Sequence, residues 1–375
     1  MNETTFAQAQ IDDLELGTLD NTYDAELQTK LDREYESARI RYELDQMHRA
    51  EMYQRIEQNL ISATDTLPEL VPIVKRKGVL ICSEGNISAV VGEAKSKKTF
   101  LCTAIVGSLM DLYKQYHFDV EPRMCKVLWV DTEQSREHIQ KVLFRINLLG
   151  MMPYNAHNAR LLTQTLREES PTDRLNQLCY AIEYHQPKLV VVDGVSDLMS
   201  NTNCLEESEA LVSRLLQLST LYRCHIMCVL HTNPNSDKAR GHLGSTLMRK
   251  AETVMFVHKV GERSVVEPQY CRNMPFERFA FMVEEIPDAT EKGKACMGLG
   301  LPVECDLPTE QEGKKNDCVR VLEELGGCAS RKLLCVKLRD SLGITDSYSR
   351  AKVTRALQKG LIAEDAEGVV SIASA

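Results

Sequence analysis

The chain has 375 residues, of which 43% are hydrophobic and 26% are charged, and its formal net charge at pH 7 is −9. This length and composition predict a soluble protein with one main domain and smaller appendages. The acidic balance, with a pI near 5.6, excludes a uniformly basic protein that coats nucleic acid. Any contact with nucleic acid must therefore be made by local basic patches.

The cysteines and the apolar runs limit where the chain can work. The 13 cysteines form no CxxC pair and have no matching histidine spacing, which disfavours a zinc site, and their odd number disfavours a disulfide scaffold. No apolar run approaches the roughly 20 residues that cross a bilayer. We therefore expect reduced thiols, a cytoplasmic location and no membrane contact.

The amino-terminal part is polar and helical in character. Residues 1–23 are acidic and weakly hydrophobic, which predicts a mobile tail. Residues 24–77 include a stretch from Asp24 to Ile61 without Gly or Pro, so we expect a long helical arm followed by a linker. The apolar stripe of this helix is thin. A solvated helix that lies on the main domain and an arm that bridges subunits both fit this pattern.

Residues 78–286 alternate short apolar runs with amphipathic helices. The runs "NISAVVG", "KVLWVDTE", "KLVVVDGV" and "CHIMCVLHTN" are continuously apolar, which is typical of parallel strands covered on both faces. They predict an α/β domain with a mainly parallel sheet. The runs "TVMFVHKV", "SVVEPQYC" and "RFAFMVEE" predict an antiparallel extension at its edge. Residues 287–315 are rich in Gly, Pro and charge, and we expect an interdomain linker there.

The stretch "AVVGEAKSKKTFL" predicts a buried strand, a turn and the start of an apolar helix. At a helix start, backbone N–H groups and the helix dipole favour a phosphate chain. Lys98 would reach the terminal phosphates of a nucleotide, and the Thr99 hydroxyl would bind Mg²⁺. The candidate nucleotide-binding residues are Gly92, Glu93, Ala94, Lys95, Ser96, Lys97, Lys98 and Thr99.

Lys97 stands where a phosphate loop usually has its last glycine. If the turn still requires positive φ there, the side chain costs on the order of 1 kcal/mol. Taken alone, "KSKKT" also fits a solvated basic turn. The strand before it, the apolar helix after it and the motifs that follow favour a nucleotide site.

The run "KLVVVDG" ends in Asp193, at the carboxyl edge of the predicted sheet. Ligands of open α/β folds bind at this edge, and a carboxylate there can hold Mg²⁺ through a water. Such a residue can instead cap the following turn. Its position downstream of the phosphate loop favours the metal role.

Together with these motifs, "KVLWVDTEQSREHIQKVLFRI" resembles the RecA-like ATPases, and more narrowly the RepA-like helicases of plasmids and mobile elements. The resemblance spans roughly residues 78 to 285. It implies a RecA-like P-loop fold that hydrolyses ATP with Mg²⁺, in which Glu133 activates the attacking water. Asp131 is the competing base, but it falls within the alternation of the strand, whereas Glu133 lies at the loop.

The segment "MCVLHTNPNSDKARGHLGSTLMRKAETVMFV" resembles the part of RecA-like motors that couples the γ-phosphate to a loop facing nucleic acid. His231 matches the polar sensor, and Asn233 can share this role. A purely structural histidine is the alternative. Lys238 and Arg240 make the following loop cationic, which fits either a mobile surface loop or a clamp for single-stranded DNA. The resemblance favours the clamp.

The segment "PQYCRNMPFERFAF" is similar to the one in which hexameric helicases present an arginine to the nucleotide of the neighbouring subunit. Arg272 matches this arginine, which makes hydrolysis depend on assembly. The basic residue usual two positions earlier is Tyr270 here, so we expect a single charge. The alternative is that Arg272 pairs with a carboxylate of its own subunit.

Residues 316–375 contain three predicted short helices and a hairpin, an order that resembles a winged helix. The third helix carries a basic outer face suited to DNA phosphates. The acidic hairpin tip "EDAEG" leaves contact with a protein as an alternative. The candidate DNA contacts of this domain are Arg350, Lys352, Arg355 and Lys359.

These features predict an ATP hydrolase that assembles as a homo-hexamer or another ring and acts on single-stranded DNA, with duplex DNA as a further partner. The expected task is helicase work in the replication or mobilisation of a plasmid, phage or integrative element, alongside replication or mobilisation proteins. Two alternatives remain open. One is a nucleotide-gated DNA-binding regulator with little turnover, and the other is a helicase-loading or recombination ATPase.

Overall fold

The computed structural model describes residues 21–110, 118–120, 126–233, 239–285, 299–309, 316–358, 360–365 and 367–373. The chain divides into two units, Met1–Glu69 and Leu70–Ala375. Most of the predicted acidic tail, residues 1–20, lies outside the described residues. Within the described ranges, each helix is too short or too polar to span a bilayer.

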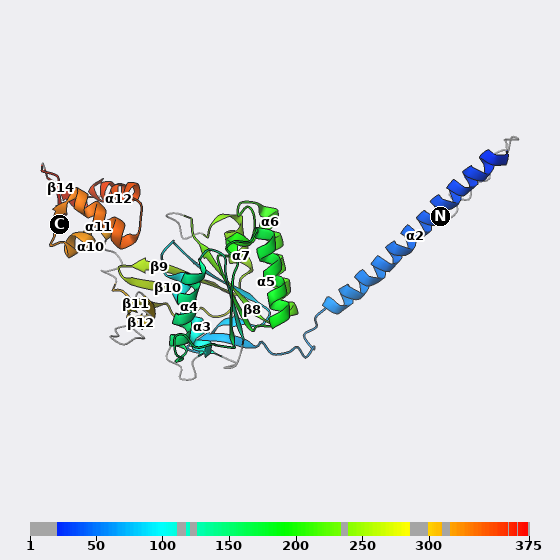
Figure 1. Ribbon diagram of the computed structural model, residues 1–375, viewed down its shortest axis with the longest axis horizontal. Helices are drawn as coiled ribbons and strands as arrows, with labels where there is room; N and C mark the ends of the chain where they lie inside the picture. The colour runs from blue at the N-terminus through cyan, green and yellow to red at the C-terminus, as the bar shows by residue number, and fades with distance from the viewer. Residues whose placement is uncertain are drawn as a thin grey trace. The chain divides into compact units, whose positions relative to one another are not determined.

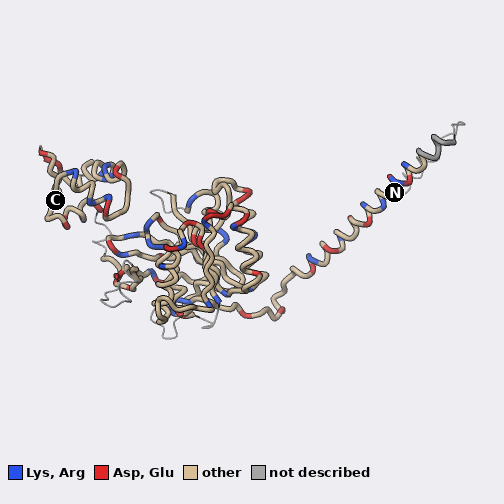
Figure 2. Tube along the Cα trace, viewed as in Figure 1, with Lys and Arg blue, Asp and Glu red and all other residues tan. Residues whose placement is uncertain are grey.

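The described part of the first unit contains one helix, α2 (Asn21–Asn59), of 39 residues. Every side chain described in it is exposed, including large apolar ones such as Leu31 and Tyr42. Acidic and basic residues alternate along it (Figure 2). The Arg39 guanidinium, for example, pairs with Glu36 at 2.8 Å. Such pairs support an exposed helix with little apolar stripe, and the role of this helix as a subunit-bridging arm stays a prediction.

The second unit is built on a nine-stranded sheet. Six neighbouring strands are parallel and the last three, at one edge, are antiparallel. Across the sheet the order is β12 (Gly300–Cys305), β11 (Phe279–Glu285), β10 (Arg263–Cys271), β9 (Thr253–Val260), β3 (Ile87–Gly92), β8 (His225–His231), β7 (Leu189–Asp193), β5 (Val127–Asp131) and β6 (Leu161–Thr165).

Helices cover both faces of this sheet, so its central strands are fully buried (Figure 1). One apolar core lies between the sheet and the helices α3 (Lys98–Met110) and α4 (Arg136–Leu149). A second core lies on the other face, under α5 (Pro171–His185), α6 (Leu205–Leu221) and α7 (Gly241–Lys250). Continuous apolar runs form the parallel strands because both faces must exclude water. The predicted α/β fold with a mainly parallel sheet is confirmed.

The sheet differs from the prediction at its edges. The run at Thr253–Val260 was expected to be antiparallel, but β9 is parallel to β3. Only β10, β11 and β12 form the antiparallel extension. The run at Leu161–Thr165 was missed because polar residues interrupt it, and it forms the edge strand β6 beside β5.

Two strands lie in segments predicted to be arm or linker. The predicted linker, residues 287–315, contains β12, which pairs with β11 over its full length. The predicted arm and linker, residues 24–77, ends in β1 (Pro72–Arg76), which pairs with β2 (Val79–Ser83) and β4 (Phe118–Val120) in a small antiparallel sheet. Proline opens β1, where a strand tolerates the missing N–H.

The carboxyl-terminal part has its own small core, in which Leu322, Leu338 and Val353 are fully buried. Its helices α10, α11 and α12 pack on a three-stranded antiparallel sheet in the order β13, β15, β14. The elements are α10 (Asp317–Glu324), β13 (Cys328–Ser330), α11 (Arg331–Leu342), α12 (Asp346–Gln358), β14 (Ile362–Glu364) and β15 (Val369–Ile372).

Candidate nucleotide site

The turn between β3 and α3 is closed and tightly packed. A Cβ atom at Gly92 would lie 2.1 Å from the Val257 carbonyl oxygen of the neighbouring strand, so only glycine fits there. Inside the turn, the Ser96 N–H donates to the Glu93 carbonyl at 3.2 Å, and α3 begins at Lys98. The turn thus opens the helix directly, as an anion-binding helix start requires.

The turn keeps the backbone conformation of a glycine-rich loop without the glycine. Lys97 has φ of 75° and Lys95 has φ of 64°, both in the left-handed region. The Ser96 hydroxyl oxygen is buried and has no hydrogen-bond partner among the described residues. A buried polar atom of this kind calls for a ligand or water. A phosphate chain therefore fits the turn.

Lys98 is 6% exposed, and its ammonium group closes over the turn. It donates to the carbonyl oxygens of Gly92 and Glu93, each at 2.9 Å. Burial lowers the pKa of Lys98 to about 8, against the opposing effects of Asp193 and Glu133. An anion beside this amine would restore its charged form.

Thr99 and Asp193 meet at the carboxyl edge of the sheet. The Thr99 hydroxyl donates to Asp193 Oδ2 at 2.8 Å. Burial, and then the neighbouring carboxylate of Asp131, raise the pKa of Asp193 to about 7. A hydroxyl and a buried carboxylate that meet at one point form a suitable oxygen donor set for Mg²⁺.

Glu133 and Asp131 have different surroundings. Asp131 is fully buried and accepts hydrogen bonds from the backbone N–H groups of Glu133 and Gln134 and from the Gln134 side chain. Its oxygens therefore hold the turn after β5. Glu133 points into the cavity with its side chain 46% exposed. This difference favours Glu133 over Asp131 as the group that can accept a proton.

His231, the last residue of β8, joins the groups above. Its Nε2 atom lies 3.8 Å from Glu133 Oε1, and its Nδ1 atom lies 3.0 Å from Lys98 Nζ. The nearby imidazole holds the pKa of Glu133 below its usual value. The carbonyl of His231 accepts the Arg240 N–H at 3.0 Å. The end of β8 is thus bonded to the residue that opens α7.

These side chains line one cavity of about 490 Å³. Its far wall is a face of α4 that sequence reasoning missed, formed by His138, Lys141 and Arg145 with Gln134 before the helix. The three helical positions follow one another at spacings of three and four, so they share one face. The spacing of these basic residues after Glu133 is the sequence signal that could have identified this face.

Arg145 on this face has a structural role as well. It is 6% exposed, its Nε atom donates to the Gly300 carbonyl at 2.8 Å, and its guanidinium carbon lies 3.9 Å from the centre of the Phe100 ring. Burial lowers its pKa to about 10. Arg145 thereby ties α4 to α3 and to β12.

Other predicted residues lie away from this cavity. The Arg272 N–H donates to the Glu252 carbonyl, and the Glu252 N–H donates to the Ile87 carbonyl at the amino end of β3. Arg272 therefore lies at the opposite end of β3 from Gly92. Its side chain donates to the Lys250 carbonyl at 2.7 Å, and its charge opposes the effect of burial, which raises the pKa of the Glu252 carboxyl.

The candidate DNA contacts fall into three groups. Lys238 and Lys359 lie outside the described residues. Arg240 and Arg355 are exposed. Lys352 bonds Asp317 of α10, and Arg350 pairs with Asp346 one turn earlier in α12 at 2.6 Å. Two of the predicted contacts are therefore already engaged within the domain.

The comparison with protein families agrees with this geometry. Residues 55–237 match the family model of the AAA domain. The AAA domain match contains the phosphate turn, Glu133, Asp193 and His231, and it stops before Arg272. It supports a P-loop ATPase with a RecA-like fold, which confirms the coarser form of the prediction. No curated protein matches the chain.

Proposed function

We propose that this protein is an ATP hydrolase of RepA-like helicase type, which forms a ring and moves on DNA. The observation that carries the hydrolase is the meeting of Lys98, Asp193, Glu133 and His231 in one cavity. Lys98 begins α3, whereas the other three lie at or just after the ends of β7, β5 and β8. Their arrangement has a phosphate anchor, a base and a sensor joined through His231, with a metal ligand, Asp193, bonded to Thr99 beside them.

In this proposal the phosphate turn and the metal-binding residues bind the nucleotide. The N–H groups of Gly92–Thr99 and the Lys98 ammonium would hold the phosphates of ATP, with Thr99 and Asp193 beside the metal. Mg²⁺, when bound, neutralises charge on the β- and γ-phosphates. Because burial raises the pKa of Asp193 more than Lys98 lowers it, a further cation at this point would stabilise its ionised form.

Glu133 accepts the proton of the attacking water. Its pKa lies below the usual value because of His231, so it is ionised and ready to act as a base at neutral pH. His231 touches both the base and Lys98, and its backbone bonds Arg240. A change at the γ-phosphate would therefore reach the loop between β8 and α7, the proposed clamp for single-stranded DNA.

Arg272 serves the nucleotide of a second copy. It lies at the amino end of β3, roughly 17 Å along the strand from the phosphate turn, since a strand rises about 3.3 Å per residue. It cannot stabilise a phosphate in its own cavity. A head-to-tail ring, a hexamer or a ring of another size, places it at the next cavity.

The carboxyl-terminal domain would bring the ring to DNA. Its order of three helices and a hairpin, with the exposed Arg355 on α12, supports a winged helix that contacts DNA phosphates. In this proposal the task is replication or mobilisation of a plasmid, phage or integrative element.

The test is ATP turnover with and without single-stranded DNA, followed by unwinding of a forked duplex. We expect DNA to stimulate turnover severalfold. Lys98→Ala should abolish nucleotide binding, whereas Glu133→Gln should keep binding and lose turnover. Tight ATP binding with negligible hydrolysis would instead support the alternative of a nucleotide-gated DNA-binding regulator, which Lys97 in the phosphate turn leaves open. Turnover without unwinding, but with stimulation of a partner helicase, would support a loading or recombination ATPase.

A further inference from the structure

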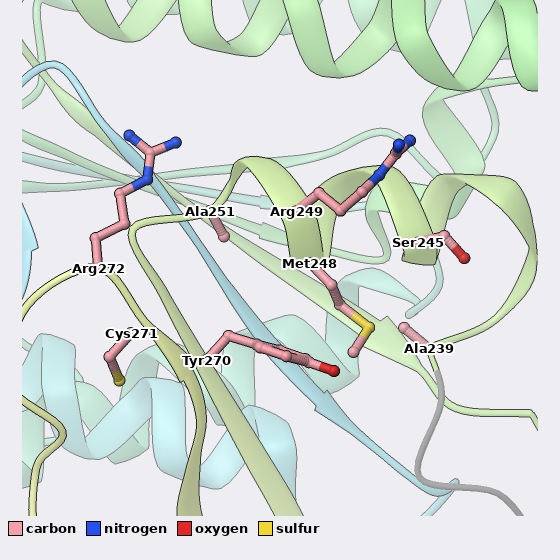
Figure 3. Close-up of a pocket in the computed structure, with 8 residues that line it drawn as sticks. All are labelled: Ala239, Ser245, Met248, Arg249, Ala251, Tyr270, Cys271 and Arg272. Atoms are coloured by element: carbon pink, nitrogen blue, oxygen red, sulfur yellow. The ribbon is translucent and has the colours of Figure 1, made fainter.

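A second cavity, of about 530 Å³, lies near the amino end of β9. It is formed by α7, by Ala251 after this helix and by the end of β10. Arg249, Met248 and Ser245 come from α7, and Tyr270 and Arg272 come from the end of β10 (Figure 3). The proposed ring contact uses Arg272 from this cavity and leaves Arg249 without a role.

The backbone around Arg272 is held firmly. Its side chain donates to the Lys250 carbonyl, the last residue of α7, and its N–H donates to the Glu252 carbonyl. Glu252 is 3% exposed and accepts hydrogen bonds from Ser83 N–H and Ser83 Oγ at 2.9 and 2.7 Å. The end of α7 and the turn after β10 therefore form one rigid frame.

Arg249 is part of the same frame, one residue before Lys250. Its strongest contact in the described structure is a long hydrogen bond of 3.4 Å to Thr246 Oγ1. Figure 3 shows the guanidinium groups of Arg249 and Arg272 on the same side of the cavity, beyond the Tyr270 ring. Among the described residues, no carboxylate lies within ion-pairing distance of either group.

Two guanidinium groups that line one cavity, neither in an ion pair among the described residues, can bind a polyanion. Each can donate two parallel hydrogen bonds to phosphate oxygens. The chemistry points to a phosphate group. It can come from the nucleotide of a second copy or from a nucleic-acid backbone.

We propose that Arg249 acts with Arg272 on the ATP phosphates bound by the neighbouring copy. This inference rests on the proposed function. Tyr270 stands where the resemblance would place a second basic residue, and Arg249 supplies that missing charge from α7. The two sites lie at opposite ends of β3, so a head-to-tail contact brings the arginine-lined cavity of one copy to the nucleotide cavity of the next, where the phosphates of bound ATP supply the negative charge.

The test mixes two inactive variants. Arg249→Ala should bind ATP normally but lose turnover by roughly 10²-fold, as expected when one preorganised donor to the transition state is removed. Glu133→Gln should bind ATP but lose turnover. In an equal mixture, about a quarter of the sites join an intact Glu133 to an intact Arg249 of the neighbour, so turnover should return to roughly a quarter of the wild-type rate. No recovery on mixing, or normal turnover by Arg249→Ala alone, overturns the proposal.

Further variants distinguish a role in hydrolysis from a role in DNA binding. Arg249→Lys should recover part of the turnover, and Arg214→Ala, an exposed arginine of the neighbouring helix α6, is the matched control without effect. Binding of single-stranded DNA to Arg249→Ala should be unchanged. Loss of DNA binding with intact DNA-free turnover would assign the cavity to nucleic acid instead.

If the wild type shows no turnover, the proposed function fails. In that case the contact of Arg249 with the phosphates of the neighbouring copy is tested by assembly with a non-hydrolysable ATP analogue. Arg249→Ala should weaken this assembly, and unchanged assembly would overturn the contact.

Discussion

Lys97 shows that a phosphate turn can keep its shape after losing its last glycine. Its φ of 75° is one that a side chain disfavours, and its ammonium group lies 5.0 Å from the centre of the Phe100 ring. Burial lowers the pKa of Lys97. The turn therefore places a basic residue with a strained backbone, Lys97, at the mouth of the nucleotide cavity.

The strain at Lys97 can be measured with two variants that both remove its side chain. Lys97→Gly should have a free energy of unfolding roughly 0.5 kcal/mol higher than Lys97→Ala, because glycine adopts positive φ without steric cost although it is more flexible when unfolded. Denaturation followed by the fluorescence of Trp129, the only tryptophan and fully buried in β5, measures both. Equal stability of the two variants would mean that position 97 is unstrained.

His225 is a buried titratable residue at the amino end of β8. It is fully buried, with Nδ1 2.8 Å from the Ser83 carbonyl and Nε2 2.8 Å from Ser88 Oγ. Burial lowers the pKa of His225 to about 4 from the ordinary value of 6.5. The folded state therefore keeps this imidazole neutral, whereas the unfolded chain takes up a proton below about pH 6.5.

Because its folded pKa is the lower one, His225 should make the protein less stable as pH falls. The loss should approach about 1.4 kcal/mol per pH unit between about pH 6 and pH 4. Denaturation by urea at pH 7.5 and pH 5 measures it in the wild type. His225→Gln, although less stable at neutral pH, should show a flatter profile over this interval. An equally steep profile in the variant would assign the acid sensitivity to other groups.

Most residues of the nucleotide cavity could be predicted from the sequence because of where they lie relative to the predicted strands. Gly92, Glu133, Asp193 and His231 each end a continuous apolar run, and parallel strands bring such ends together at one edge. His138 and Lys141 were missed because they lie within a helix. Polar helical residues are normally solvated, and only the placement of α4 shows that these two face the cavity.

At the scale of elements, α4 is the wall of the nucleotide cavity opposite the phosphate turn. Lys141 is exposed on that wall, so its charge can reach a bound nucleotide without being needed for folding. Lys141→Ala should raise the Kd for ATP about fivefold, the effect of losing one exposed charge contact. Titration with a fluorescent ATP analogue measures the Kd. Arg136→Ala, on the same helix but outside the cavity, should have no effect, and an equal loss there would mean a general effect of charge.

The helix α12 is the element proposed to contact DNA, and only part of its basic face is available. Lys352 is bonded to Asp317, whereas Arg355 is exposed, with its guanidinium carbon 5.9 Å from the centre of the Tyr348 ring. The prediction of a continuous basic face overlooked the short acidic residues of α10. A helical pattern does not reveal which neighbouring helix supplies a counter-charge.

Arg355→Ala should weaken DNA binding about equally for all sequences. It should also reduce the slope of log K against log salt concentration by about 1, as for the loss of one phosphate contact. Fluorescence anisotropy at several salt concentrations measures both quantities. Lys337→Ala, an exposed lysine of α11 in the same domain, is the control. An unchanged slope in Arg355→Ala would favour the alternative that this domain binds a protein.

The apolar runs of the second unit predicted its fold class. The errors of the prediction concern which strands pair and in which direction. Continuous runs identify parallel strands, but the direction of β9 depends on the length and path of the α7 connection. The strand β12 lies in a segment rich in Gly and Pro, and it is a strand only because β11 offers a free edge. Pairing between strands far apart in sequence is decided by the assembled sheet.

At the scale of the whole molecule, the proposed hydrolysis depends on a nucleotide site shared between copies. The phosphate turn and the cavity that holds Arg249 and Arg272 lie at opposite ends of β3, so in this proposal the arginines of one copy complete the site of another. The most direct measurement is the mass of the protein in solution with Mg²⁺ and a non-hydrolysable ATP analogue. We predict a ring of uniform mass for the wild type and a smaller species for Lys98→Ala under the same conditions. A wild-type protein that stays a single chain while it hydrolyses ATP at full rate would contradict the shared site.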